Sequence, residues 1–195
     1  MKSLEFRPFS ERQRRPSLEM APILGNTYQM LGPRRRADNF EFVGPNGGED
    51  AIPTLATIGY EGKTQGEFLG ELEEAGIEVL IDVRAVAASR RPGFSKTALA
   101  GALRERSIDY LHLRALGTPA AGREAARKGR VAEMRAIYAD QLETPEAAFA
   151  FEQVLAAAVD RRAALLCYER EAAGCHRSML AERMIERAPF EIVNL

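Results

Sequence analysis

The chain has 195 residues, of which 46% are hydrophobic and 28% are charged, and its formal net charge is -1. This composition excludes a chain that is disordered throughout and a histone-like binder that depends on a large positive charge. No apolar run reaches the roughly 18 residues of a membrane span, and the first residues lack the apolar core of a signal peptide. We therefore expect a cytoplasmic protein that makes no membrane contact.

Residues 1–52 are predicted to form a flexible extension before a single domain at 53–195. The extension contains two arginine clusters, at residues 12–15 and 34–36. A solvated tail is the simpler interpretation, and contact of the arginines with nucleic acid or a partner is the alternative. A strand or hairpin around residues 40–43 is compatible with the pattern. The remaining part, about 140 residues, has the usual size of one domain.

From residue 54 onward, short apolar runs alternate with helical periodicity, which is typical of βα units and a largely parallel sheet. Residues 55–60 and 78–83 predict two strands, the second apolar enough to be buried on both faces. Between them, Thr64 and Glu67 have the spacing of a capping box, which predicts a helix that ends near Gly76.

Ser95 is predicted to cap a helix that runs to about residue 106, and residues 109–113 predict a third strand. The segment 116–130 contains three glycines and one proline, and it predicts a loop. A further helix is expected at 131–142.

Thr144 followed by Pro145 predicts the start of another helix. Its buried face is expected to consist of Ala148, Phe151, Leu155 and Val159. Residues 163–168 predict the fourth strand. A helix at about 176–187 and a closing strand at 190–193 complete an α/β domain of three layers, in which helices flank a mostly parallel sheet of about five strands.

Reactive side chains are scarce, because the sequence has two cysteines and two histidines. Cys167, Cys175 and His176 fall within ten residues of one another, whereas His112 stands apart. Two cysteines cannot form the disulfide framework of a small secreted domain, and with one adjacent histidine they are one ligand short of a closed zinc site. The segment 167–176 is therefore the first candidate for a functional site.

Parallel α/β sheets bind ligands beyond the carboxyl ends of their strands, because the free loops and helix N-termini meet at that edge. The predicted strand ends deliver most of the candidate reactive residues to this edge. These residues are Gly59, Tyr60, Asp82, Arg84, His112, Cys167 and Glu169.

Cys167 ends its predicted strand, and Cys175, His176, Arg177 and Ser178 begin the next helix. Unpaired N–H groups and the helix dipole favour an anion there, so the pKa of the Cys175 thiol is expected to be lowered. Cys175 is a candidate nucleophile or metal ligand, and Cys167 is its candidate redox partner or a second ligand. Either cysteine could instead act as a small buried hydrophobic residue.

His112 could serve as a general base or ligand, or it could be a hydrogen-bonded packing residue. Asp82 could orient His112 or an arginine, or cap the loop that follows it. Gly59, just before Tyr60, permits a tight turn and is weak evidence for phosphate binding.

Two basic stretches follow predicted strand ends. The first stretch has four basic residues and no acidic one: Arg84, Arg90, Arg91 and Lys96. The second has five basic residues and one acidic residue, Glu124; the basic ones are Arg114, Arg123, Arg127, Lys128 and Arg130. Solvated loops explain such stretches equally well. The sharper interpretation is an anionic substrate, with phosphate the natural choice because arginine binds it bidentately.

The combined pattern resembles the domain of unknown function 488 family. The resemblance rests on Thr57-Ile-Gly-Tyr-Glu-Gly62, Ile81-Asp-Val-Arg84, Ser89-Arg-Arg-Pro-Gly-Phe-Ser-Lys96, Tyr110-Leu-His-Leu113 with Leu116-Gly117, Cys167-Tyr-Glu169 and Cys175-His-Arg-Ser178. It implies a compact α/β domain from about residue 54 to the C-terminus and supplies no established activity. Tyr60-Glu61 stands where many members have His-Ser, which weakens any inference about a catalytic histidine there.

Three functions remain open from the sequence. The first is an enzyme that acts on an anionic, phosphate-bearing or nucleotide-like small molecule. In it, Cys175 is nucleophile or ligand, and His112 or Glu169 moves protons. The anion is bound by four arginines, and four further residues are candidates for substrate binding: Arg84, Arg90, Arg91 and Arg177, with Gly59, Tyr60, Asp82 and Ser178.

The second is a metal or thiol redox module in which Cys167, Cys175 and His176 bind zinc or iron, with His112 or Glu169 as a further ligand. The third is a nucleic-acid-binding module that uses the basic loops.

Overall fold

The computed structural model describes residues 52–195. The predicted extension, apart from its last residue, and the strand or hairpin around residues 40–43 lie outside the described residues. Within this part of the chain, no helix has the length and apolar character needed to cross a membrane.

Five parallel strands form one sheet, in the spatial order β3-β2-β4-β1-β5. The strands are β1 (Thr54–Gly59), β2 (Val79–Asp82), β3 (Asp109–His112), β4 (Ala163–Cys167) and β5 (Glu191–Asn194). β4 returns to the centre of the sheet between β2 and β1, and every residue of β4 is buried. The predicted α/β fold with a parallel five-stranded sheet is confirmed.

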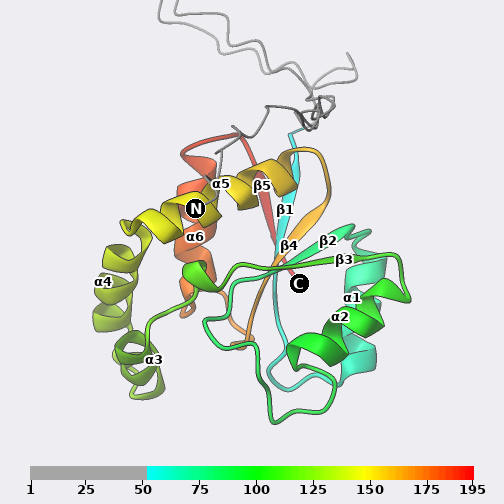
Figure 1. Ribbon diagram of the computed structural model, residues 1–195, viewed down its shortest axis with the longest axis horizontal. Coiled ribbons are helices and arrows are strands. Elements are labelled where there is room, and N and C mark those ends of the chain that lie inside the picture. The colour runs from blue at the N-terminus through cyan, green and yellow to red at the C-terminus, as the bar shows by residue number, and fades with distance from the viewer. Residues whose placement is uncertain (1–51) are drawn as a thin grey trace, which may run out of the picture. The chain divides into compact units, whose positions relative to one another are not determined.

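Helices α1 (Gln65–Glu74) and α2 (Lys96–Arg104) cover one face of the sheet (Figure 1). Alternate strand residues point to this face, and they include Ile58, Leu80 and Leu166. The core here is completed by Phe68 and Leu72 of α1 together with two leucines of α2.

The opposite face is covered by α4 (Val131–Leu142), α5 (Pro145–Val159) and α6 (His176–Ile185), which pack on the other set of alternate strand residues (Figure 1). Ile81 and Leu165 belong to this second core. The fold therefore has the predicted three layers, with a hydrophobic core on each side of the sheet.

Two predicted helix starts are confirmed. Thr64 forms the capping box with Glu67, since the Thr64 Oγ1 accepts from the Glu67 N–H and the Glu67 carboxylate accepts from the Thr64 N–H. Thr144 caps α5, where Pro145 is the first helical residue. Ser95 occupies the N-cap of α2, but its hydroxyl bonds to the backbone of Ser89 and not to the helix.

The predicted loop at 116–130 is wrong. A short 3-10 helix η1 (Arg114–Leu116) is followed by α3 (Ala120–Arg127), which packs on α4. Gly122 was one of the three glycines that suggested a loop, yet it lies inside α3, and a Cβ there would meet the Thr118 Cγ2 at 2.6 Å. This glycine permits close packing of the helix.

The buried face of α5 also differs from the predicted one. Ala148 is exposed and Val159 is half-buried, whereas Phe151 and Leu155 are buried as expected. The buried residues are Ala147, Ala150, Phe151, Val154, Leu155 and Ala158, a face rotated by about one position.

The helices that follow β2 and β4 lie on opposite faces of the sheet, although the two strands are neighbours. The chain therefore leaves the carboxyl ends of these strands in opposite directions. Such a switch point is the usual place for a ligand site in an open α/β sheet. The end of β4 carries Cys167.

Candidate metal centre

Four side chains with metal-binding atoms meet where β4 ends and α6 begins. They are Cys167 at the last position of β4, Glu169 in the following loop, Cys175 at the N-cap of α6 and His176 at the first position of that helix. One ligand atom of each lies within 4.8 Å of all the others. Both cysteines are free thiols.

The thiols and the carboxylate are in direct contact. The Cys167 Sγ donates to the Glu169 Oε2 at 2.8 Å, and the Cys175 Sγ donates to the same oxygen at 3.2 Å. The His176 Nδ1 lies 3.5 Å from the Cys167 Sγ and 3.6 Å from the Cys175 Sγ.

These sulfur–nitrogen separations fit a common tetrahedral ion. Zinc binds sulfur at about 2.3 Å and nitrogen at about 2.0 Å, so two such ligands on a tetrahedral ion lie about 3.5 Å apart. Cys167 and Cys175 are buried, and His176 is 6% exposed. Glu169 is half-buried and is the most solvent-accessible member of the cluster.

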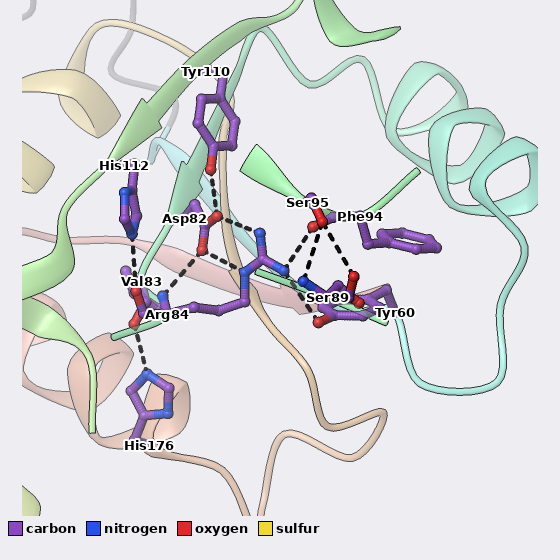
Figure 2. A network of polar contacts seen from close by, with 10 residues as sticks. All are labelled: Tyr60, Asp82, Val83, Arg84, Ser89, Phe94, Ser95, Tyr110, His112 and His176. Carbon is purple, nitrogen blue, oxygen red and sulfur yellow. Dashed lines mark hydrogen bonds and ion pairs between the residues drawn. The ribbon is translucent and has the colours of Figure 1, made fainter. Parts of the chain in front are cut away.

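The orientation of His176 is determined by a backbone carbonyl. The His176 Nε2 lies 3.1 Å from the Val83 carbonyl oxygen, which can only accept, so Nε2 carries a proton (Figure 2). The Nδ1 atom therefore faces the two sulfurs. A ligating histidine is commonly held this way, with its second ring nitrogen bonded to a carbonyl or carboxylate.

The cluster favours a positive charge at the His176 Nδ1. Burial opposes this, but hydrogen bonds to Cys175 and to the Val83 carbonyl raise the pKa of His176. Burial would also raise the pKa of Glu169, but the hydrogen bonds from Cys167 and Cys175 lower it, and the carboxylate stays ionised. A proton or a metal ion could supply the charge that this environment favours.

The expected lowering of the Cys175 pKa is wrong. The hydrogen bond with Cys167, together with burial, raises the pKa of Cys175 well above its ordinary value, and His176 offsets only part of this effect. The Arg177 guanidinium donates to Thr57, Glu169 and Arg170, and not to the Cys175 sulfur. Without a metal ion, Cys175 is not an activated thiol.

Arg177 holds the loop that carries Glu169. Its side chain is 1% exposed, and its Nη1 donates to the Glu169 carbonyl, its Nη2 to the Arg170 carbonyl at 2.8 Å and its Nε to the Thr57 Oγ1 at 3.2 Å. Gly59 completes this support, because a Cβ at residue 59 would lie only 1.8 Å from the Glu169 carbonyl oxygen. Both residues thus position the loop, and no bound anion is needed to explain them.

Arg84 lies in a second polar cluster, beyond the end of β2 (Figure 2). Its Nε and Nη2 donate to the two carboxylate oxygens of Asp82 at 2.8 and 2.6 Å, and its Nη1 donates to the Tyr60 hydroxyl and the Phe94 carbonyl. Tyr110 donates to Asp82 from the opposite side. Asp82 is fully buried and Arg84 is 5% exposed.

His112 joins this second cluster and lies outside the metal-binding group. Its Nε2 donates to the Arg84 carbonyl at 2.9 Å. The carbonyls of two consecutive residues, Val83 and Arg84, therefore accept from His176 and His112 respectively. The Asp82–Arg84 pair fixes the segment that orients His176.

The remaining predicted substrate-binding residues are dispersed. Tyr60 is buried and stacks on Phe94 with ring centroids 4.4 Å apart. Arg90 is exposed, while Arg91 donates to the Lys63 carbonyl and is half-buried. The Ser178 hydroxyl donates to the Cys175 carbonyl at 2.9 Å, within the first turn of α6. The expected roles of these residues in substrate binding stay predictions.

A cavity of about 380 Å³ borders the four-residue cluster. It is lined by Thr118, Arg123, Ala126, Arg127, Met134, Tyr168, Glu169, Gly174, Cys175 and His176. The sequence placed Arg123 and Arg127 in a basic stretch but did not assign them to the site. Their spacing of four residues would have placed them on one face of a helix, had the segment not been interpreted as a loop.

The described part of the chain is thus an α/β protein with a buried Cys/Glu/Cys/His group that could hold a metal ion. Residues 64–184, more than half of the chain, match the family described as Domain of unknown function DUF488, and the protein belongs to this family. The match confirms the resemblance seen in the sequence. The chain has no significant match among the curated proteins or the solved structures.

Proposed function

We propose that the protein is a metal-dependent enzyme whose centre is a zinc ion bound by Cys167, Glu169, Cys175 and His176. The observation that supports this most directly is the orientation of His176. Its Nε2–H is bonded to the Val83 carbonyl, and its Nδ1 faces two thiols that converge on one carboxylate. These four residues offer one nitrogen, two sulfur and one oxygen ligand atom, all within 4.8 Å of one another.

The ligand chemistry favours zinc. Thiolate and imidazole ligands in a tetrahedral arrangement are typical of zinc, whereas magnesium and calcium prefer oxygen ligands. Iron is the other metal expected from the sequence, and it is distinguished by metal analysis. The ion would be bound by the two thiolates and the carboxylate together with the imidazole. It would act as a Lewis acid toward an oxygen atom of the substrate, or it would activate a water molecule.

A reactive centre is favoured over a purely structural one. Structural zinc sites are closed, while catalytic sites keep one position that water or substrate occupies. Glu169 is only half-buried and borders the cavity, together with Cys175 and His176. Replacement of Glu169 on the metal by water or by an anionic substrate would open that position. A thiol redox module would use the same two sulfurs, but it would need neither Glu169 nor His176 as a ligand.

Metal binding is tested by titrating the purified, metal-free chain with zinc and by measuring metal content after dialysis. We expect one zinc per chain. Cys175→Ala, Cys167→Ala and His176→Asn should each lower the zinc affinity by about two orders of magnitude, because a ligand is lost. Cobalt substituted for zinc should give thiolate-to-metal absorption that is weakened, to about half for a single remaining thiolate, in each cysteine variant and is unchanged in His112→Asn.

Two matched controls are available in the chain. His112→Asn removes the second histidine, which lies outside the cluster, and should retain zinc. Glu171→Gln alters an exposed carboxylate in the same loop as Glu169 and should also retain it, whereas Glu169→Gln should weaken binding. Equal zinc binding by His176→Asn and His112→Asn would contradict the proposal, and so would disulfide formation that leaves the wild-type chain without metal.

A further inference from the structure

Two arginines of α3 line the cavity beside the proposed zinc site. Arg123 and Arg127 line it together with Glu169, Cys175 and His176 of the β4–α6 segment. Arg123 is half-buried and donates to the Thr118 carbonyl at 2.8 Å, whereas Arg127 is exposed at the cavity edge. The same cavity is therefore lined by two arginines and by three of the four candidate metal ligands.

The two arginines are neighbours on one face of α3. They are separated by four residues, and Ala126, which lies between them, lines the same cavity. Like charges at this spacing repel each other and weaken an isolated helix. An anion bound between the two guanidinium groups would remove this repulsion.

Other basic residues nearby have acidic partners. Lys128 pairs with Glu124, Arg130 with Glu133 and Arg135 with Glu182. Within residues 52–195, no ion pair involves Arg123 or Arg127. The positive charges of Arg123 and Arg127 are therefore not neutralised by an acidic side chain of the described residues, unlike those of their basic neighbours.

We propose that Arg123 and Arg127 bind the phosphate group of a small-molecule substrate, with the rest of the molecule reaching the metal centre. This inference rests on the proposed function, because the metal centre is where the substrate would react. The two residues that would bind the phosphate group both lie on α3. Two guanidinium groups match the charge of a phosphate dianion and can donate several hydrogen bonds to its oxygens. A volume of about 380 Å³ suits a small metabolite rather than a polymer.

The test uses inorganic phosphate as the probe and isothermal titration calorimetry at constant ionic strength. The zinc-loaded chain, the metal-free chain and the Cys175→Ala variant are each titrated. Arg127→Gln should lower phosphate affinity by about ten- to a hundredfold, the effect of losing a charge-assisted hydrogen bond. Arg123→Lys, which keeps the positive charge while losing the planar fork, should lower it by a smaller factor.

Lys128→Gln is the matched control, because it removes one positive charge from the adjacent residue, which does not line the cavity. Its phosphate affinity should stay within about twofold of wild type, as expected for a screened exposed charge. Arg127 lies on the surface, so Arg127→Gln is expected to fold, which circular dichroism can check.

The two proposals fail in different ways. If the chain binds zinc but phosphate binding is absent, or is the same in Arg127→Gln as in Lys128→Gln, the phosphate site is overturned and the metal centre stands. If phosphate binding depends on Arg127 in a chain that takes up no zinc, the phosphate site is supported and the metal centre is overturned.

Discussion

Two polar clusters lie at the carboxyl edge of the sheet, and they differ in how completely their members bond to one another. In the cluster around Arg84, the carboxylate of Asp82 accepts four hydrogen bonds, from the Arg84 backbone and side chain and from Tyr110. In the cluster around His176, two thiols share a single carboxylate oxygen, and the Nδ1 of His176 faces both sulfurs.

The difference separates a structural network from a ligand site. Asp82 and Arg84 supply complementary donors and acceptors, so the pair is satisfied within the protein. The four residues of the cluster that contains His176 are all good metal ligands, and a cation at their centre would satisfy them together. The two clusters are nevertheless connected, because the backbone segment fixed by the first one orients the histidine of the second.

The largest expected effect is on stability, in the Arg84 network. Arg84→Ala leaves the Asp82 carboxylate buried without its partner, and we expect the free energy of unfolding to fall by about 3–5 kcal/mol. Urea denaturation measures this change. Arg106→Ala, which removes an exposed ion pair with Glu73, should cost less than about 1 kcal/mol. Similar losses of stability in Arg84→Ala and Arg106→Ala would contradict the claim that the buried ion pair contributes more than the exposed one.

Zinc itself should stabilise the fold through the second cluster. At a free zinc concentration about 100 times the dissociation constant, the free energy of unfolding should rise by about 2.7 kcal/mol, because the ion binds the native state. Thermal unfolding with and without zinc measures the effect. The gain should persist in His112→Asn and fall to about 0.4 kcal/mol in His176→Asn, whose zinc affinity is expected to be about a hundredfold lower. A wild-type unfolding midpoint that zinc leaves unchanged would contradict the account of this cluster.

A smaller effect is expected at Gly59, which allows the Glu169 backbone to approach β1. Gly59→Ala forces that loop to move, and we expect a loss of about 1–3 kcal/mol in stability and weaker zinc binding. Gly70→Ala is the control, because a Cβ there has open space inside α1. It should stabilise the protein by about 0.5–1 kcal/mol. Unchanged zinc affinity in Gly59→Ala would show that Glu169 does not depend on this approach.

The smallest effect concerns the edge of the Arg84 network. Tyr110→Phe removes one of the donors to Asp82 and leaves the bonds from Arg84 in place, so stability should fall by about 1 kcal/mol. Zinc content should not change. A loss of stability as large as that of Arg84→Ala would mean that the hydrogen bond from Tyr110, and not the ion pair with Arg84, is the main stabilisation of the buried Asp82 carboxylate.

The sequence predicted the sheet well because its signals are local. The apolar runs at β2 and β4 and the capping box at Thr64 are readable from neighbouring residues alone. The helix within segment 116–130 is not predicted because glycine usually disfavours a helix, whereas Gly122 makes room for the Thr118 side chain beside α3, a contact that only the folded structure shows.

The candidate site was predictable in part. Strand ends and a helix start brought Cys167, Cys175 and His176 to one place, and Glu169 was one of two suggested further ligands. The partners of Arg84 and Arg177 could not be predicted, because an arginine's sequence position does not show whether its guanidinium bonds to the protein or to an anion. The arginines that do face the cavity, Arg123 and Arg127, lay in the segment interpreted as a loop.

The central claim is that one zinc ion binds between Cys167, Glu169, Cys175 and His176. X-ray absorption spectroscopy of the zinc-loaded chain tests it most directly, since it reports the atoms around the ion. The account predicts two sulfur ligands at about 2.3 Å and two nitrogen or oxygen ligands at about 2.0–2.1 Å, with one sulfur lost in Cys175→Ala. A coordination shell of oxygen and nitrogen alone, or one that Cys175→Ala leaves unchanged, would contradict it.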